Sequence, residues 1–289
     1  MSCWDKASVK TKGQGIASRQ GRQSQKKTEK GRNVAEKSEK ELQQFGKRLQ
    51  DLADRAYKQN LFTFTDFLGL AEQDVFWRME SELRGAGARL WGGREGADRV
   101  MLRFGNPEEL GYEAEFPIVC IHISPLNQRF ADDLSHRDFL GALMNLGMER
   151  ETLGDIIVGE KQAYLFCLES MAEFIVDNLS QVKHTSVTCE IVKEWKELLQ
   201  EEPKKELLQV AAPRADAVIA KVWKLSREES ISLFRAGKVF IAGRSCENNS
   251  RTLKAGETVN ARGYGKFVFV GEKGETRKGK INVEVAVYR

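Results

Sequence analysis

The sequence predicts an α+β protein with about two folded domains. Its length of 289 residues suggests this number of domains. The centre of the chain alternates between strand-like and helix-like patterns, and the C-terminal end shows two helical patterns followed by glycine-punctuated strands. Apolar residues make up 41% of the chain, which is enough for a core in each domain.

The first 35 residues are basic and nearly lack large apolar side chains. They contain nine Lys and Arg against two acidic residues, a net charge of +7. Such a segment buries too little apolar surface to offset the entropy lost on ordering. We therefore expect residues 1–35 to be a disordered basic tail. It could attract phosphates, be a plain solvated extension or be a transit peptide, and the sequence leaves these alternatives open.

Residues 36–194 are expected to hold a helical lead-in and one α+β domain. Apolar residues at three- and four-residue steps predict helices over residues 34–58 and 66–85. Two apolar runs around a Gly-rich turn, 88–91 and 99–104, predict a hairpin. The elements that follow are in the order βαββαβ, which is the split motif of ferredoxin-like and RNA-recognition folds. They are a strand at 116–123, a helix at 135–146, strands at 155–158 and 162–168, a helix at 169–182 and a strand at 186–192.

A second domain is predicted after a linker. Residues 195–209 are charged and helix-prone apart from Pro203, and we interpret residues 195–212 as that linker. Residues 213–289 begin with a helix over 216–223. A second helix starts at Ser226, which forms a capping box with Glu229, and it ends before Gly237. Short strands are expected at 238–242, 258–261, 266–270 and 280–288.

Charge is distributed unevenly along the chain. Residues 213–289 hold sixteen Lys and Arg against eight acidic residues, a net charge of +8. Because the whole chain carries only +4, the segment between the two basic ends carries −11. A basic end attached to a compact fold is the electrostatic pattern of a protein that binds a polyanion.

Two arginines stand where the C-terminal helices begin. Arg214 precedes the first helix, and Arg227 follows the Ser226 cap. A cation at this end of a helix opposes the helix dipole. The placement becomes favourable if a phosphate arrives, because it meets arginine, free backbone N–H groups and the dipole together. The alternative is that both arginines pair with nearby carboxylates, and the sequence leaves both interpretations open. The nearby carboxylates are Asp216, Glu228 and Glu229.

Several spaced motifs over residues 213–270 resemble an S-four-type RNA-binding domain, the αL-motif module. They are Arg214-Ala-Asp216, Leu225-Ser-Arg-Glu228, Ala236 to Gly243, Leu253 to Glu257 and Arg262 to Phe267. The central segment resembles the YlmH family, in which an RNA-recognition-like domain precedes the S-four-type domain. Its motifs are Phe104 to Leu110, Ser124 to Phe130, His136 to Gly141 and Leu146 to Ile157. The chain departs from the pattern at Ala215, where a leucine is usual, and in its basic tail.

The resemblance implies an RNA-binding, ribosome-associated protein. Its partners would be ribosomal RNA and tRNA on the large ribosomal subunit, in ribosome rescue or translation quality control. Arg214 and Arg227 would contact RNA phosphates, and Lys238, Arg262 and Lys266 are further candidates on the strands. We expect a cytoplasmic monomer that binds neither membrane nor small-molecule substrate.

The sequence does not predict a catalytic site, a cofactor or a metal. Five dispersed cysteines and three dispersed histidines give no ligand spacing, so reduced, buried or idle thiols are expected. His136-Arg-Asp138 has the letters of a kinase catalytic loop but lacks the other kinase motifs, and a helix start is favoured. Two alternatives stay open: an RNA-modifying enzyme similar to pseudouridine synthases, and a protein-interaction adaptor in cell division.

The central strands could also offer bases a stacking surface. His122 lies on one of them, and Tyr164 and Phe166 lie on the other. Aromatic side chains at such positions stack on bases in RNA-recognition folds. Packing in the core is the more common role of such residues, and the acidic balance of this domain makes protein contact a further alternative.

Overall fold

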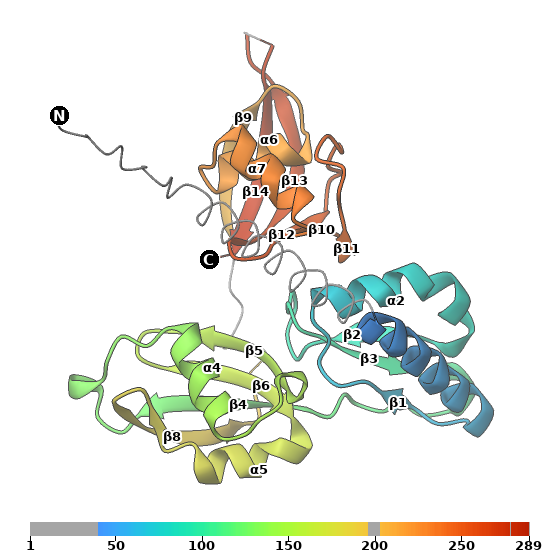
Figure 1. Cartoon of the computed structure of the whole chain (residues 1–289), viewed down its shortest axis with the longest axis vertical. Helices are drawn as coiled ribbons and strands as arrows, with labels where there is room; N and C mark the ends of the chain where they lie inside the picture. Colours follow the sequence, from blue (N-terminus) through green and yellow to red (C-terminus); the bar gives the residue numbers. More distant parts are fainter. Residues whose placement is uncertain (1–39, 196–202, 278, 289) are drawn as a thin grey trace, which may run out of the picture. The chain divides into compact units, whose positions relative to one another are not determined.

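The computed structural model describes residues 40–195, 203–277 and 279–288. It is an α+β structure with antiparallel sheets, which confirms the predicted fold class. The predicted basic tail, residues 1–35, and residues 196–202 of the predicted linker lie outside the described residues. The described residues from Arg48 onward form one compact unit, and Figure 1 shows its helices and sheets.

The N-terminal part of this unit is built on a small sheet in the order β1-β3-β2. A helix over residues 40–59 buries Leu49, Ala53 and Ala56. The predicted hairpin is confirmed, since Trp91 pairs with Met101 across its two strands. Strand β1 was not predicted because it contains only two residues. The elements here are β1 (Thr63–Phe64), α2 (Leu70–Leu83), β2 (Arg89–Trp91), β3 (Met101–Phe104) and α3 (Pro107–Leu110).

The central domain has the predicted βαββαβ order of elements. Its sheet order is β5-β6-β4-β8-β7, so the first and third strands of the motif lie in the middle, as in ferredoxin-like folds. Helices α4 and α5 cover one face of the sheet (Figure 1) and pack on Ile121, Ile123 and Leu165. Its elements are β4 (Ile118–Pro125), α4 (His136–Asn145), β5 (Leu153–Val158), β6 (Ala163–Leu168), α5 (Glu169–Asn178), β7 (Gln181–Val182) and β8 (Thr185–Val192).

The start of α4 confirms that His136-Arg-Asp138 begins a helix. The Ser135 backbone N–H and hydroxyl both donate to the Asp138 carboxylate, at 2.8 and 2.7 Å. Phe139 points into the core and is 1% exposed. Each of these residues therefore has a structural role, as expected for a helix N-terminus.

The opposite face of the central sheet packs on the N-terminal part. Phe67 and Met101, from that part, pack there on Ile118, Cys120 and Phe166. This second apolar cluster joins the N-terminal lead-in to the central domain. Tyr164 of the same sheet is partly buried against it.

The C-terminal module contains two helices and a six-stranded sheet in the order β11-β10-β12-β13-β14-β9. The predicted helices and strands are confirmed to within a few residues, except that β13 extends further. Ala215, the departure from the family pattern, is fully buried in the core of this module. The elements are β9 (Lys204–Val210), α6 (Ala215–Val222), α7 (Arg227–Arg235), β10 (Val239–Ile241), β11 (Arg244–Ser245), β12 (Thr258–Ala261), β13 (Gly265–Glu275) and β14 (Ile281–Tyr288).

The interpretation of residues 195–212 as a linker with a helix-prone stretch over 195–209 is wrong for residues 204–210. These residues form strand β9, which pairs along β14 from Ile281 to Val287. Leu208 packs on the core of the module and Val210 is buried within it, while Leu207 points outward and is 63% exposed. A two-residue alternation of this kind is typical of an edge strand, and the partner that selects it lies more than 70 residues later.

Four cysteines among the described residues are free and buried, as expected for reduced, structural thiols. Burial raises the pKa of Cys120 and Cys167 to about 12, so both stay protonated at neutral pH. None of the helices in the described part of the chain has the length and apolar character needed to cross a membrane.

Candidate RNA-binding surfaces

The first helix start of the C-terminal module is organised by an ion pair. Arg214 is the N-cap of α6, and its Nε and Nη2 atoms donate to the Asp216 carboxylate at 3.0 and 2.7 Å. Asp216 is 2% exposed and also accepts from Asn249 Nδ2 and the Ala217 N–H. The carboxylate pairing that the sequence left open is therefore present for Arg214, whose side chain stays 33% exposed.

Electrostatics keep this pair charged. Burial raises the pKa of Asp216, but hydrogen bonds from Arg214 and Asn249 outweigh it, so the pKa lies below its ordinary value. The hydrogen bond to Asp216 raises the pKa of Arg214. The guanidinium is thus fixed in place, and its Nε/Nη2 edge is occupied.

The second helix start leaves its arginine free. The Ser226 hydroxyl accepts from the Glu229 N–H at 3.2 Å, and the Glu229 carboxylate accepts from the Ser226 N–H at 2.8 Å, so the predicted capping box is confirmed. Arg227 is exposed, and no ion pair involving it occurs in the part of the chain that the structure describes. The capping box occupies Glu229, and Arg227 remains available to an anion.

A hydrogen bond links the two helix starts. The Ser230 hydroxyl, in the first turns of α7, donates to the Asp216 backbone carbonyl in the first turn of α6, at 2.8 Å. Ser230 is fully buried at this crossing. Arg214 and Arg227 therefore lie on the parts of α6 and α7 that meet at this bond.

The three predicted strand-side cations differ in exposure. Lys238 and Arg262 are both exposed, and the Arg262 N–H donates to the Lys238 carbonyl at 2.9 Å, which places the two residues together. The Arg262 guanidinium lies over the Phe240 ring, 5.0 Å from its centroid. Lys266 departs from the expectation, because it is 5% exposed and its ammonium pairs with Asp98 at 2.9 Å.

The aromatic residues of the central sheet divide between two roles. Phe166 is fully buried in the second apolar cluster, in line with core packing. Tyr164 and His122 are half-buried on the same face, and their rings stack with centroids 4.8 Å apart. Gln162 fixes the His122 ring through a contact of 2.9 Å to Nε2. Lys and Arg are absent from this row of the sheet, which runs through Ile157, Tyr164, His122 and Glu190.

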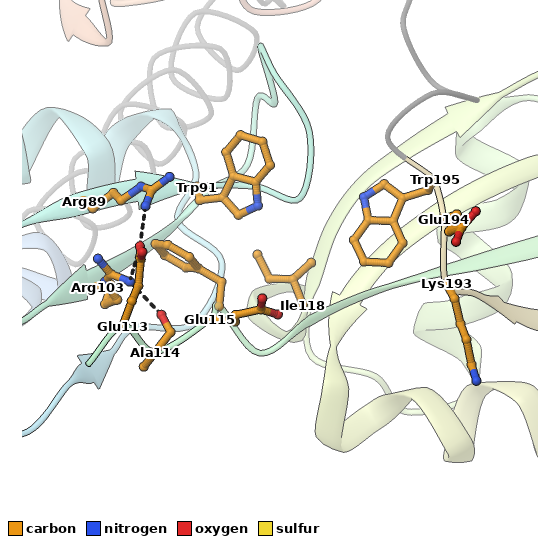
Figure 2. Close-up of a pocket in the computed structure, with 11 residues that line it drawn as sticks. Arg89, Trp91, Arg103, Glu113, Ala114, Glu115, Ile118, Lys193, Glu194 and Trp195 are labelled. Carbon is orange, nitrogen blue, oxygen red and sulfur yellow. Dashed lines mark hydrogen bonds and ion pairs between the residues drawn. The ribbon is translucent and has the colours of Figure 1, made fainter. Parts of the chain in front are cut away.

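An open groove of about 1020 Å³ lies beside the second apolar cluster. Figure 2 shows Trp91 and Trp195 on either side of Ile118, with Arg89 and Arg103 beyond Trp91. The sequence did not predict this site. Its signal was a tryptophan at the end of a predicted strand, Trp91, and another at the start of the predicted linker, Trp195. The lining residues are Arg89, Trp91, Arg103, Glu113, Ala114, Glu115, Phe116, Ile118, Lys193, Glu194 and Trp195.

One wall of the groove is held by a buried arginine. The Arg103 side chain is 3% exposed and lies between the rings of Phe62 and Phe116, at 4.7 and 5.5 Å. Its Nη1 donates to the Ala114 carbonyl at 2.6 Å and to Glu113 at 3.3 Å. Arg89 donates to the same Glu113 at 2.7 Å (Figure 2). The buried Nε of Arg103 has no partner among the described residues.

Comparisons with known proteins place this geometry in context. The chain is 28% identical to the "Ribosome-associated protein quality control protein P2" of Bacillus subtilis over 228 residues, which are 76% of this chain and 84% of that protein. A solved structure, "Cell division protein ylmH from Streptococcus pneumoniae", is 21% identical, with a TM-score of 0.43, and covers 54% of this chain and 93% of its own. Residues 112–196 match the family model described as "Putative RNA-binding domain in YlmH". The resemblance to the YlmH family that the sequence motifs indicate is confirmed by this match and by the names of the similar proteins.

Proposed function

We propose that this protein is an RNA-binding, ribosome-associated factor. The observation that carries the proposal is the pair of arginines at the crossing helix starts, one held at the surface by Asp216 and the other exposed and free of ion pairs in the described structure. They stand in a module of net charge +8. The RNA-binding family model and the ribosome-associated relative support the same class of function.

The finer proposal is that the C-terminal module grips ribosomal RNA or tRNA on the large ribosomal subunit, in ribosome rescue or translation quality control. A phosphate would meet the free edge of Arg214, the whole guanidinium of Arg227 and the backbone N–H groups of the helix starts. Lys238 and Arg262 would add a second phosphate contact. Lys266 would not, because it is buried.

The same proposal describes a cytoplasmic monomer that acts by binding and not by catalysis. The family description and the name of the ribosome-associated relative both refer to a binding or quality-control protein and not to an enzyme. The helix starts fit this role, because Asp216 and Glu229 are engaged in internal hydrogen bonds while the Arg227 guanidinium is exposed.

Ribosome co-sedimentation tests the proposal. The double variant Arg214→Ala/Arg227→Ala should lose most of its association at moderate salt, because two phosphate contacts disappear. The Arg227→Ala variant separates charge from folding, since no internal bond of the described structure depends on its side chain. Arg55 is an exposed arginine on the helix of residues 40–59. The Arg55→Ala variant is the control for Arg227→Ala, because each loses one positive charge. Unchanged association of the folded double variant would refute the phosphate contact.

A further inference from the structure

We propose that the groove of Figure 2 binds an unpaired nucleobase of single-stranded RNA, which stacks on Trp91 and Trp195. The inference rests on the proposed RNA-binding function. It assigns to the central domain a second contact, with the base and not with the phosphate.

The aromatic walls are fixed before any ligand arrives. The Trp195 indole Nε1–H donates to the Gly93 carbonyl at 2.8 Å, and its ring contacts the buried Phe166 edge-on, with centroids 6.1 Å apart. Trp91 is held in strand β2, opposite Met101. Both tryptophans are only half-buried, so part of each ring stays accessible. Fixed aromatic side chains lose little conformational entropy when they bind a ligand.

The charges around the groove balance one another. The cations Arg89, Arg103 and Lys193 face an equal number of carboxylates, Glu113, Glu115 and Glu194. Such a lining has little attraction for a run of phosphates. It suits one base, whose face stacks on aromatic rings and whose amino groups donate to carboxylates.

The groove also lies largely in the part of the chain that matches an RNA-binding family model. Eight of the eleven lining residues lie within residues 112–196, the match to the RNA-binding family model, which also favours a nucleic-acid occupant.

Fluorescence titration of the full chain with two oligonucleotides tests the inference. The probes are a single-stranded oligoadenylate of about eight nucleotides and an abasic oligomer of the same length and charge. Stacking should quench tryptophan emission with the oligoadenylate and not with the abasic oligomer. Trp91→Ala should weaken oligoadenylate binding by roughly tenfold, and Trp91→Phe should restore part of the affinity.

The matched control is Trp77→Phe, which removes a tryptophan of α2 that does not line the groove. Trp195→Phe is an independent second variant, and thermal melts show which variants are folded. Equal binding of the abasic oligomer, or unchanged affinity of the folded Trp91→Ala and Trp195→Phe variants, would overturn the inference. The inference would also be overturned if these variants lost the binding of a protein partner and kept the binding of oligoadenylate. Binding of duplex ribosomal RNA by the Arg214→Ala/Arg227→Ala variant reports on the proposed function separately.

Discussion

The C-terminal module and the groove of the central domain differ in how they would hold RNA. At the helix starts, cations are exposed or fixed at the surface and the module has a large positive charge. In the groove, charges of both signs balance and two half-buried tryptophans, Trp91 and Trp195, are part of the lining. The first arrangement favours the shared backbone of all RNA, and the second favours unpaired bases. One chain can therefore combine strong but unselective attraction with a weaker preference for single strands.

The largest change in stability is expected at Asp216, the buried carboxylate at the helix starts, which has no counterpart in the groove. Asp216→Ala removes the acceptor of Asn249, the Ala217 N–H and Arg214 together. We expect the free energy of unfolding to fall by about 2 kcal/mol, because buried donors lose their partner. Denaturant unfolding measures this change. No loss of stability would show that Arg214 does not depend on Asp216 for its position.

The Asp216→Asn variant is the control for this prediction, since it keeps the shape and removes the charge. The pKa of Asp216 is lowered in the folded protein. The stability that it contributes is therefore present above its unfolded pKa and is lost as the pH falls through the folded value. The difference in stability between wild type and Asp216→Asn should be full at neutral pH and shrink below about pH 4. A difference that is independent of pH would contradict the role of the charge.

A smaller effect, on the salt dependence of RNA affinity, distinguishes the helix starts from the groove. Arg227→Ala should reduce the slope of log affinity against log salt by about 0.7 to 0.9, the value of one phosphate contact. Trp91→Ala should lower affinity for the single strand and leave this slope unchanged. Fluorescence or filter titrations at several salt concentrations measure both. If both variants changed the slope alike, the contrast between the regions would be lost.

The smallest effect is expected at Lys266, the predicted contact that the structure buries. Lys266→Ala should leave RNA affinity within about twofold of wild type, because an internal ammonium releases no counterion from RNA. Lys238→Ala is the matched variant, since its ammonium is exposed on the same module. A loss at Lys266 as large as that at Lys238 would mean that the lysine becomes exposed when RNA binds.

Local patterns predicted most of the fold and long-range pairing explains what was missed. The capping box at Ser226, the helix start at His136 and the order of elements in the central domain could be predicted from neighbouring residues. Strand β9 could not, because its pairing with β14 joins residues more than 70 positions apart. The groove was missed for the same reason, since Trp91 and Trp195 lie about 100 residues apart.

The two arginines show where spacing stops being informative. Both follow the same sequence pattern, a cation at a helix start beside carboxylates. The structure pairs Arg214 with Asp216 and engages Glu229 in the capping box instead of pairing it with Arg227. Which carboxylate turns toward which cation depends on Asn249 and on the crossing of α6 and α7, and neither can be read from local sequence.

Strand β9 has a consequence for any attempt to study the C-terminal module in isolation. It precedes both helices and hydrogen-bonds along the outer side of β14. A fragment that begins at Pro213 would keep every motif that resembles an S-four-type domain and yet leave that side of β14 without its partner. An unpaired strand edge can form hydrogen bonds with the edge of another chain. Such a fragment would therefore tend to self-associate, and a fragment that stays soluble as a monomer should begin ahead of Lys204.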